Sequence, residues 1–245
     1  MRKALLGLTV LVVLIPAVAT AGWQPLTGDP VSLASLEGES IIVGDKEFSD
    51  FELIGGGQGG AIAPDPAAVL VQGGWDAVTG DYGLRFVLSW GVGSGQIINA
   101  NLNFTVAILD LPQWEDWYIE DCGIVLTGAS ATSTGVVNAS ETVWDGPIPN
   151  GGVLASLSVS KQQLDGGAYL VDWAVFRPVK MVWVRKDISI AGGTGPGGAA
   201  HLSEVFQFYS QVPEPTAVAI IVVGAVVLLR RRRHAWAVRN SMIVG

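Results

Sequence analysis

This chain of 245 residues has little cysteine, little histidine and few basic residues away from its two ends. Its one cysteine, Cys122, excludes an intrachain disulfide, so the hydrophobic core must provide the stability. The two histidines, His201 and His234, leave little for a nucleophile that needs an imidazole base. Because Cys122 lies in a stretch typical of a strand (117–126), we expect its thiol to be buried and inert.

Positive charge is scarce in the middle of the chain. The span from Gly22 to Leu229 holds all 22 acidic residues but only seven basic ones, a formal net charge of −15. Such an acidic surface repels phosphate backbones, which argues against nucleic acid as a partner. It favours solubility and is compatible with divalent cations. The seven basic residues are Lys46, Arg85, Lys161, Arg177, Lys180, Arg185 and Lys186.

Helical periodicity is also absent from the middle of the chain, where apolar and polar residues alternate instead. This alternation predicts half-buried strands. On one of them, Asn101, Asn103 and Thr105 should face away from the core. The four apolar faces are Leu84, Phe86, Leu88 and Trp90; Leu102, Phe104, Val106 and Ile108; Tyr169, Val171, Trp173 and Val175; and, less regularly, Val182, Val184, Lys186 and Ile188.

Clusters of glycine separate these stretches and predict turns. They are 55–57, 73–74, 93–95, 146–147, 150–152, 165–167 and 192–198. About ten short strands joined by such turns predict an all-β domain, an antiparallel β-sandwich of jelly-roll type. A closed barrel is the alternative. The span 22–211, about 190 residues, is long enough for one sizeable core.

The N-terminus has the order of a secretory signal peptide. Arg2 and Lys3 precede an apolar stretch (4–18), and small residues follow at Ala19 and Ala21. This pattern predicts a signal peptide over residues 1–21, cleaved after Ala21 by signal peptidase once the general secretion machinery has exported the chain. An uncleaved anchor is the alternative, although the stretch is short for a membrane span.

The C-terminus combines a proline-rich step, an apolar run and a basic cluster. Pro213 and Pro215 favour an extended backbone for the residues before them. The apolar run 217–229 would span roughly 20 Å as a helix, which makes it a marginal transmembrane helix. We expect the basic cluster to act as a stop-transfer signal on the cytoplasmic side, so residues 22–216 would lie outside. The two motifs are Val212, Pro213, Glu214 and Pro215, and Arg230, Arg231, Arg232 and Arg233.

This tripartite order, over residues 212–233, resembles the PEP-CTERM family of bacterial sorting signals. The resemblance implies cleavage near Pro213–Pro215 by an exosortase, a membrane-embedded processing enzyme. It also implies an association with exopolysaccharide and biofilm matrix. Four segments are therefore expected: a signal peptide (1–21), a secreted β-sandwich domain (22–211), a sorting signal (212–233) and a short cytoplasmic tail (234–245).

Aromatic and acidic residues supply the remaining candidates for binding. The stretch 114–121 places two acidic pairs beside three aromatics, which suits calcium or a sugar ring, or simply a loop followed by a strand. Trp75, Trp114 and Trp144 lie near turns and are candidates for exposure. We expect core positions for Trp90, Trp173 and Trp183. The sequence contains no calcium-loop spacing and no identifiable pair of carboxylates for a glycosidase.

These patterns predict an exported bacterial cell-surface or extracellular-matrix protein that an exosortase processes. We expect no enzymatic activity, no cofactor and no metal, and an association with exopolysaccharide. A carbohydrate-binding module or adhesin that uses exposed aromatics is the alternative, and a secreted hydrolase is a third possibility.

Overall fold

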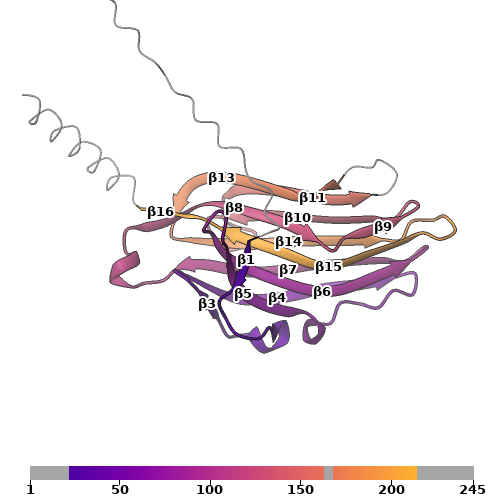
Figure 1. Ribbon diagram of the computed structural model, residues 1–245, viewed down its shortest axis with the longest axis horizontal. Coiled ribbons are helices and arrows are strands. Elements are labelled where there is room, and N and C mark those ends of the chain that lie inside the picture. Colours follow the sequence, from indigo (N-terminus) through magenta and orange to yellow (C-terminus); the bar gives the residue numbers. More distant parts are fainter. Residues whose placement is uncertain (1–21, 163–167, 214–245) are drawn as a thin grey trace, which may run out of the picture.

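The computed structural model describes residues 22–162 and 168–213 as two antiparallel sheets that lie face to face (Figure 1). The first sheet has the order β1-β5-β6-β15-β8-β13, with β2, β9 and β16 paired to β5, β15 and β8. Its strands are β1 (Trp23–Pro25), β2 (Val31–Ser32), β5 (Leu70–Asp76), β6 (Tyr82–Gly93), β8 (Trp117–Thr127), β9 (Ser130–Thr132), β13 (Val171–Val179), β15 (Ala199–Tyr209) and β16 (Gln211–Pro213).

The second sheet has the order β12-β11-β10-β14-β7-β4-β3. Its strands are β3 (Ile41–Val43), β4 (Lys46–Gln58), β7 (Ile97–Ile108), β10 (Val136–Trp144), β11 (Val153–Gln162), β12 (Ala168–Tyr169) and β14 (Met181–Ala191). Three short 3₁₀ helices complete the described elements: η1 (Leu33–Leu36), η2 (Pro66–Ala68) and η3 (Pro112–Trp114).

The chain crosses repeatedly between the two layers. Consecutive strands such as β6 and β7, or β14 and β15, belong to different sheets, and all strand pairs of the described residues are antiparallel. The predicted all-β, antiparallel class is therefore confirmed. Among the described residues no helix is long and apolar enough to cross a membrane. The predicted segments 1–21 and 217–233 lie outside the described residues.

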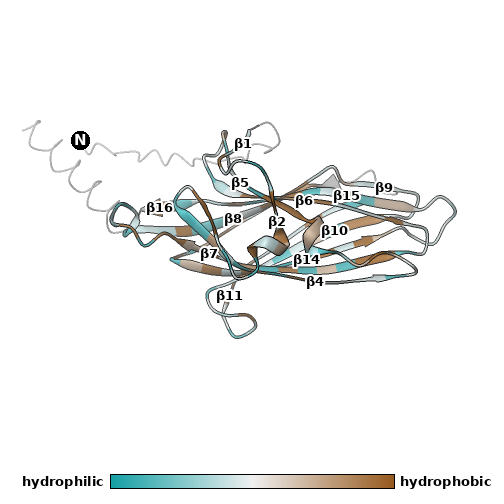
Figure 2. Cartoon of the chain, turned by 90° about the horizontal axis from the view of Figure 1, so that it is seen from below, coloured by the Kyte–Doolittle hydropathy of each residue, from teal (hydrophilic) through white to brown (hydrophobic). Residues whose placement is uncertain are grey.

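The core lies between the sheets and follows the alternation of the strands, visible as alternating brown and teal along them in Figure 2. The apolar faces predicted for β6 and β7 are buried, from Leu84 to Trp90 and from Leu102 to Ile108. The face predicted for β13 is wrong: Trp173 packs on the outside of the first sheet, and Val175 is 79% exposed. On this edge strand the opposite parity holds the buried Phe176, while Asp172 and Ala174 are half-buried.

Two of the predicted glycine turns are also wrong, because residues 55–57 lie inside β4 and residues 73–74 lie inside β5. A Cβ on Gly73 would lie 2.4 Å from Val43, and one on Gly74 would lie 2.5 Å from the backbone oxygen of Gln24. Glycine is required at these two positions because neighbouring chain segments approach the strand closely.

Aromatic rings fill part of the outer face of the first sheet. Trp23 meets Phe206 edge to face, with ring centroids 5.2 Å apart, and Trp173 stacks on Phe208 at 6.0 Å. The rings of Phe206 and Phe208 are themselves parallel, 6.1 Å apart. The two sheets therefore differ: the outer face of the first carries a packed aromatic cluster, and that of the second is mostly polar.

Candidate functional site

The outward side chains of β10, β14, β7 and β4 form the polar face of the second sheet. Strand register places Trp144 opposite Trp183, and Trp183 opposite Thr105. The next row across the same strands runs from Thr142 through Arg185 to Asn103 and Glu52. Further rows carry amides, hydroxyls and one acid, namely Ser140, Asp187 and Asn101, then Asn138, Ser189 and Asn99. The face thus combines two adjacent tryptophans with a field of mostly uncharged polar groups.

A hollow of about 290 Å³ lies at the tryptophan end of the polar face. Trp183 and Arg185 of β14 line it together with side chains of β4 and β7. The loop between β10 and β11 supplies two apolar residues to its lining. The remaining lining residues are Asp50, Glu52, Asn103, Phe104, Thr105, Pro147 and Ile148.

A β-bulge brings Asp50 to this hollow. The pairing of β4 with β7 shifts between Ser49 and Glu52, and Asp50 adopts a positive φ of 55°. Aspartate tolerates this left-handed conformation better than most residues, and bulges redirect side chains. As a result Asp50 and Glu52 both reach the hollow, and Asp50 accepts a hydrogen bond of 2.8 Å from Thr105 Oγ1.

Hydrogen bonds fix the polar side chains of the second row. Asn103 Nδ2 donates to Glu52 Oε2 at 2.8 Å, and Arg185 Nε donates to Asn103 Oδ1 at 3.1 Å. The two terminal nitrogens of Arg185 have no hydrogen-bond partner among the described residues. The hollow therefore offers a tryptophan side chain, spare guanidinium donors and carboxylate acceptors in fixed positions.

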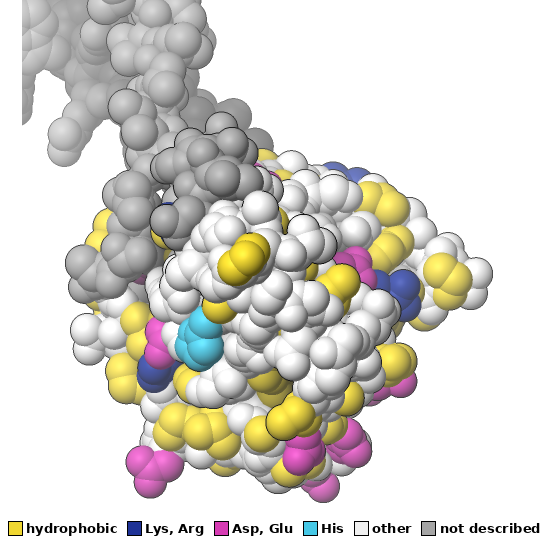
Figure 3. Space-filling model, turned by 90° about the vertical axis from the view of Figure 1, so that its right-hand side faces the viewer, with side chains coloured by type: hydrophobic (Ala, Val, Ile, Leu, Met, Phe, Trp, Pro, Cys, Tyr) yellow, Lys and Arg dark blue, Asp and Glu magenta, His cyan; other side chains and the backbone are white. Residues whose placement is uncertain are grey.

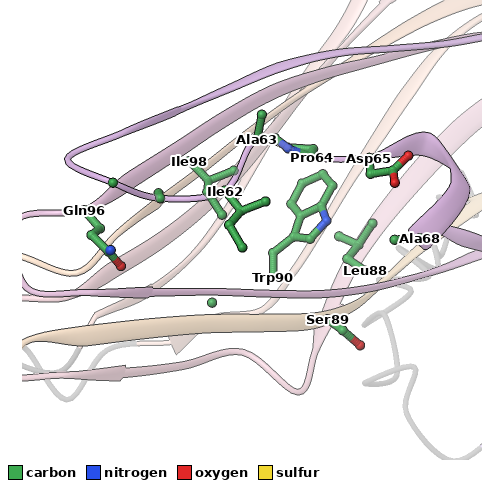
Figure 4. A pocket seen from close by; sticks show the side chains of 13 residues that line it. Ile62, Ala63, Pro64, Asp65, Ala68, Leu88, Ser89, Trp90, Gln96 and Ile98 are labelled. Atoms are coloured by element: carbon green, nitrogen blue, oxygen red, sulfur yellow. The ribbon is translucent and has the colours of Figure 1, made fainter.

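A second cavity, of about 400 Å³, lies beside Trp90 under the loop that joins β4 to β5. Figure 4 shows Trp90 pointing into this cavity with Ile62 and Leu88 on either side. Its polar groups already hold the local structure: Asp65 caps η2 by accepting from Ala67 N at 2.9 Å, and Gln96 accepts from Gly93 N at 2.7 Å. Since Trp90 is only 7% exposed, this cavity presents little aromatic surface to a ligand.

The tryptophans only partly follow the predictions. Trp75, Trp114 and Trp144 are half-buried, neither fully exposed nor in the core, whereas Trp90 is buried as predicted. The core placement predicted for Trp173 and Trp183 is wrong, because both lie on outer faces of the sandwich. The signal was present in the sequence, since Trp183 lies between the inward-facing Val182 and Val184 and shares the parity of Arg185.

The aromatic and acidic stretch 114–121 forms a loop end and a strand. Trp114 meets Trp117 edge to face at 5.4 Å, and Glu115 and Asp116 point into solvent. Among the described residues no group of three or more acidic, histidine or cysteine side chains converges to hold a metal ion. The described residues therefore provide no cluster of ligands for the calcium site considered for this stretch.

Cys122 is completely buried in β8, which confirms the predicted buried thiol. Burial, together with the nearby Glu141, raises the pKa of Cys122 far above the ordinary thiol value, so the group stays protonated. His201, the one histidine of the described residues, is exposed on β15 opposite Ser130 of β9 (Figure 3). The structure does not bring this imidazole to the thiol.

The residues predicted as a sorting motif begin on the last described strand. Val212 and Pro213 belong to β16, which pairs with Trp117–Ile119 of β8. Gln211 anchors this strand by accepting a hydrogen bond from the fully buried Lys46, which also pairs with Asp45 at 2.8 Å. Burial lowers the pKa of Lys46. The other predicted residues lie outside the described residues, namely Ala19, Ala21, Glu214, Pro215, Arg230, Arg231, Arg232 and Arg233.

Comparison with known proteins gives no family: no family model matches the chain, and no curated protein does. Among solved structures, a carbohydrate-binding module of the β-sandwich superfamily aligns at 10% identity and a TM-score of 0.26, over 65% of this chain and only 54% of its own. A family 11 carbohydrate-binding module from Clostridium thermocellum, solved with a β-1,3-1,4-mixed-linked tetrasaccharide, aligns at 12% identity and a TM-score of 0.24, over 68% and 96%. Scores this low leave the function to be argued from the polar face itself.

Proposed function

We propose that this protein is a non-catalytic surface protein that binds a neutral polysaccharide through the polar face. The observation that carries the proposal is the hollow at Trp183, where an aromatic side chain lies beside fixed amide, guanidinium and carboxylate groups. A sugar ring has an apolar C–H face that an aromatic ring can cover and a rim of hydroxyl groups that needs donors and acceptors. Few polar groups in fixed positions around an apolar surface are typical of small-ligand sites.

The extent of the polar face favours a chain of sugars over a single one. Outward side chains recur on each strand about every 7 Å, so the rows beyond the hollow can contact neighbouring rings of one chain. The charge of the domain favours a neutral chain, because the acidic span 22–229 would repel an anionic polysaccharide.

We further propose that the protein is exported and that an exosortase cleaves it near Pro213–Pro215, as the terminal sequences predict. Cell-surface or matrix exopolysaccharide would then be the natural ligand. In that case the second sheet holds the ligand, while β16, which pairs with β8 of the first sheet, carries the first two residues of the sorting motif.

Affinity electrophoresis tests the binding proposal. The protein is run through native gels that contain a soluble neutral polysaccharide, beginning with β-1,3-1,4-mixed-linked glucan, or an anionic one, alginate. Retardation is expected in a neutral gel and not in the anionic gel. Trp183→Ala should weaken binding roughly thirtyfold, about 2 kcal/mol, as removal of a central aromatic anchor does.

The matched control is Trp75→Ala, which removes a half-buried tryptophan of β5 in the other sheet. It should leave the retardation unchanged. Migration that no neutral polysaccharide slows, or equal loss of retardation in both variants, would refute binding by the polar face.

A further inference from the structure

The core of the sandwich contains three polar side chains that the polar face does not use. Glu141 of β10, Lys186 of β14 and Gln207 of β15 are each at most 1% exposed. Glu141 and Lys186 are directly opposite in the register of β10 and β14, and Gln207 reaches them from the other sheet. Their neighbours along β10 and β14 are apolar and equally buried: Ala139, Val143, Val184 and Ile188.

The three side chains form a closed triangle of contacts. Lys186 Nζ pairs with Glu141 Oε2 and donates to Gln207 Oε1. Gln207 Nε2 donates to Glu141 Oε1 at 2.8 Å. One carboxylate therefore touches both the lysine amine and the amide nitrogen of the glutamine. A buried ion pair seldom stabilises a fold more than well-packed apolar residues would, so its presence calls for another explanation.

We propose that Lys186 and Gln207 form an isopeptide bond inside the core, with Glu141 transferring the protons. Lys186 Nζ contacts the amide oxygen of Gln207, so the amide carbon lies only one C=O bond, about 1.2 Å, farther along the side chain. The sandwich holds the two groups together and excludes water, which are the conditions under which an amine can replace ammonia in an amide.

The reaction balances without any other reactant. One proton first moves from Nζ to Glu141, which leaves a neutral amine and a carboxylic acid. Nζ then bonds to Cδ of Gln207 while the bond from Cδ to Nε2 breaks. Glu141 gives its proton to the departing nitrogen and takes the second proton from Nζ, so ammonia leaves and Glu141 remains protonated.

The surroundings favour this route. Burial raises the pKa of Glu141, while Lys186 and Gln207 oppose the increase, so the carboxylic acid form is accessible. The hydroxyl of Tyr209 is completely buried close to Gln207. In the proposed reaction it would donate to the negative charge that develops on the amide oxygen.

The bond would join the two layers covalently. Lys186 belongs to the second sheet and Gln207 to the first, and the sequence has only one cysteine. An isopeptide bond would thus supply the cross-link that a disulfide cannot supply here.

Peptide mapping of the full chain by mass spectrometry tests the proposal. Trypsin should fail to cleave between Lys186 and Asp187, because the lysine is an amide, and the peptide that begins at Lys186 should be lighter than its sequence by one ammonia. After further cleavage behind Glu204, the two fragments should stay joined. A peptide that begins at Asp187, with Gln207 of normal mass, would overturn the proposal.

Lys46 is the internal control. It is fully buried and contacts the side-chain oxygen of Gln211, but its partner Asp45 makes no hydrogen bond to the Gln211 amide nitrogen. Trypsin should therefore cleave after Lys46 in the same digest. A Lys46–Gln211 link would show that proximity alone suffices and would overturn the role of Glu141.

The variant Glu141→Gln tests that role directly while it keeps both partners of the bond. Loss of the proton carrier should slow bond formation about a hundredfold or more, so freshly made protein should contain mostly free Lys186. If this variant does not fold, Glu141→Asp, which shortens the carrier but keeps its charge, should give a lower linked fraction than the wild type. Linkage at the wild-type level in a folded variant would refute the proton transfer.

Discussion

The buried thiol of Cys122 predicts a specific loss of stability in alkali. Burial raises the pKa of this thiol far above its ordinary value of 9.0 in the folded protein, whereas the unfolded chain keeps the ordinary value. Above about pH 9 the unfolded state therefore loses a proton that the folded state retains, and the free energy of unfolding falls as the pH rises. Below pH 9 both states are protonated and the effect is absent.

The magnitude follows from the two pKa values. A thiol that ionises only in the unfolded state lowers the free energy of unfolding by about 1.4 kcal/mol between about pH 8 and about pH 10. Cys122→Ala removes this contribution and adds a packing loss that does not depend on pH. The difference in stability between wild type and variant should therefore shrink by about 1.4 kcal/mol over this range, because the other titrating groups are common to both proteins.

Unfolding in urea, followed by tryptophan fluorescence under reducing conditions, measures this difference at each pH. A difference that stays constant from about pH 8 to about pH 10 would mean that the thiol ionises in the folded protein, and would refute its burial in the core. The same result would reopen the interpretation of Cys122 as a reactive group.

Three further predictions concern stability. A Cβ at Gly83 would lie 1.8 Å from the backbone oxygen of Gln207, so Gly83→Ala should lower the free energy of unfolding by about 1–3 kcal/mol or more in thermal melts, whereas Gly56→Ala, with nothing within 4 Å, should have little effect. Gln207→Met keeps the Lys186–Glu141 pair but removes the proposed bond, which closes a loop of 21 residues. Loss of this cross-link should lower the free energy of unfolding in urea by ~3 kcal/mol. If the wild type is not linked, the variant would lose only the hydrogen bonds of Gln207. Burial alone would raise the pKa of Glu204, but hydrogen bonds from Arg85 and Thr127 lower it below the ordinary 4.5. The stability that these hydrogen bonds provide should therefore disappear as the pH falls below 4.5. In circular-dichroism melts, Glu204→Gln should lack this acid dependence.

The alternation of apolar and polar residues predicts the inward face of a strand well where that strand lies inside its sheet and the other sheet covers one side. The inward sets of β6 and β7 are predicted correctly because these strands lie inside their sheets and one side of each is wholly buried. The edge strand β13 is predicted with the wrong face, because its outward Trp173 finds an apolar surface in Phe208. Hydrophobicity alone does not tell a core from an aromatic cluster on an outer face.

Glycine and lysine mark the other limits of the sequence patterns. The glycines of β4 and β5 resemble turn signals, yet the tight contact at Gly73 depends on a residue 30 positions away, Val43, which only the folded chain brings near. Lys186 has the same parity as the apolar residues Val182, Val184 and Ile188, so the alternation places its charge on the inward face of the strand. Its partners are 45 and 21 residues away, and no local pattern reveals that pairing.

The polar face and the buried triangle share strands β10 and β14. On β10, Thr142 points outward and Glu141 inward; on β14, Arg185 points outward and Lys186 inward. Glu141 and Lys186 are therefore the sequence neighbours of Thr142 and Arg185 in the second row of the polar face. The proposed bond would fix the strands that position this row, as a binding site held by rigid supporting contacts requires. Because the two sets point in opposite directions, they can be separated experimentally. Trp183→Ala should weaken retardation by polysaccharide roughly thirtyfold and leave the Lys186–Gln207 link intact. Glu141→Gln should reduce the link and should weaken binding only through the stability of the sheet behind it.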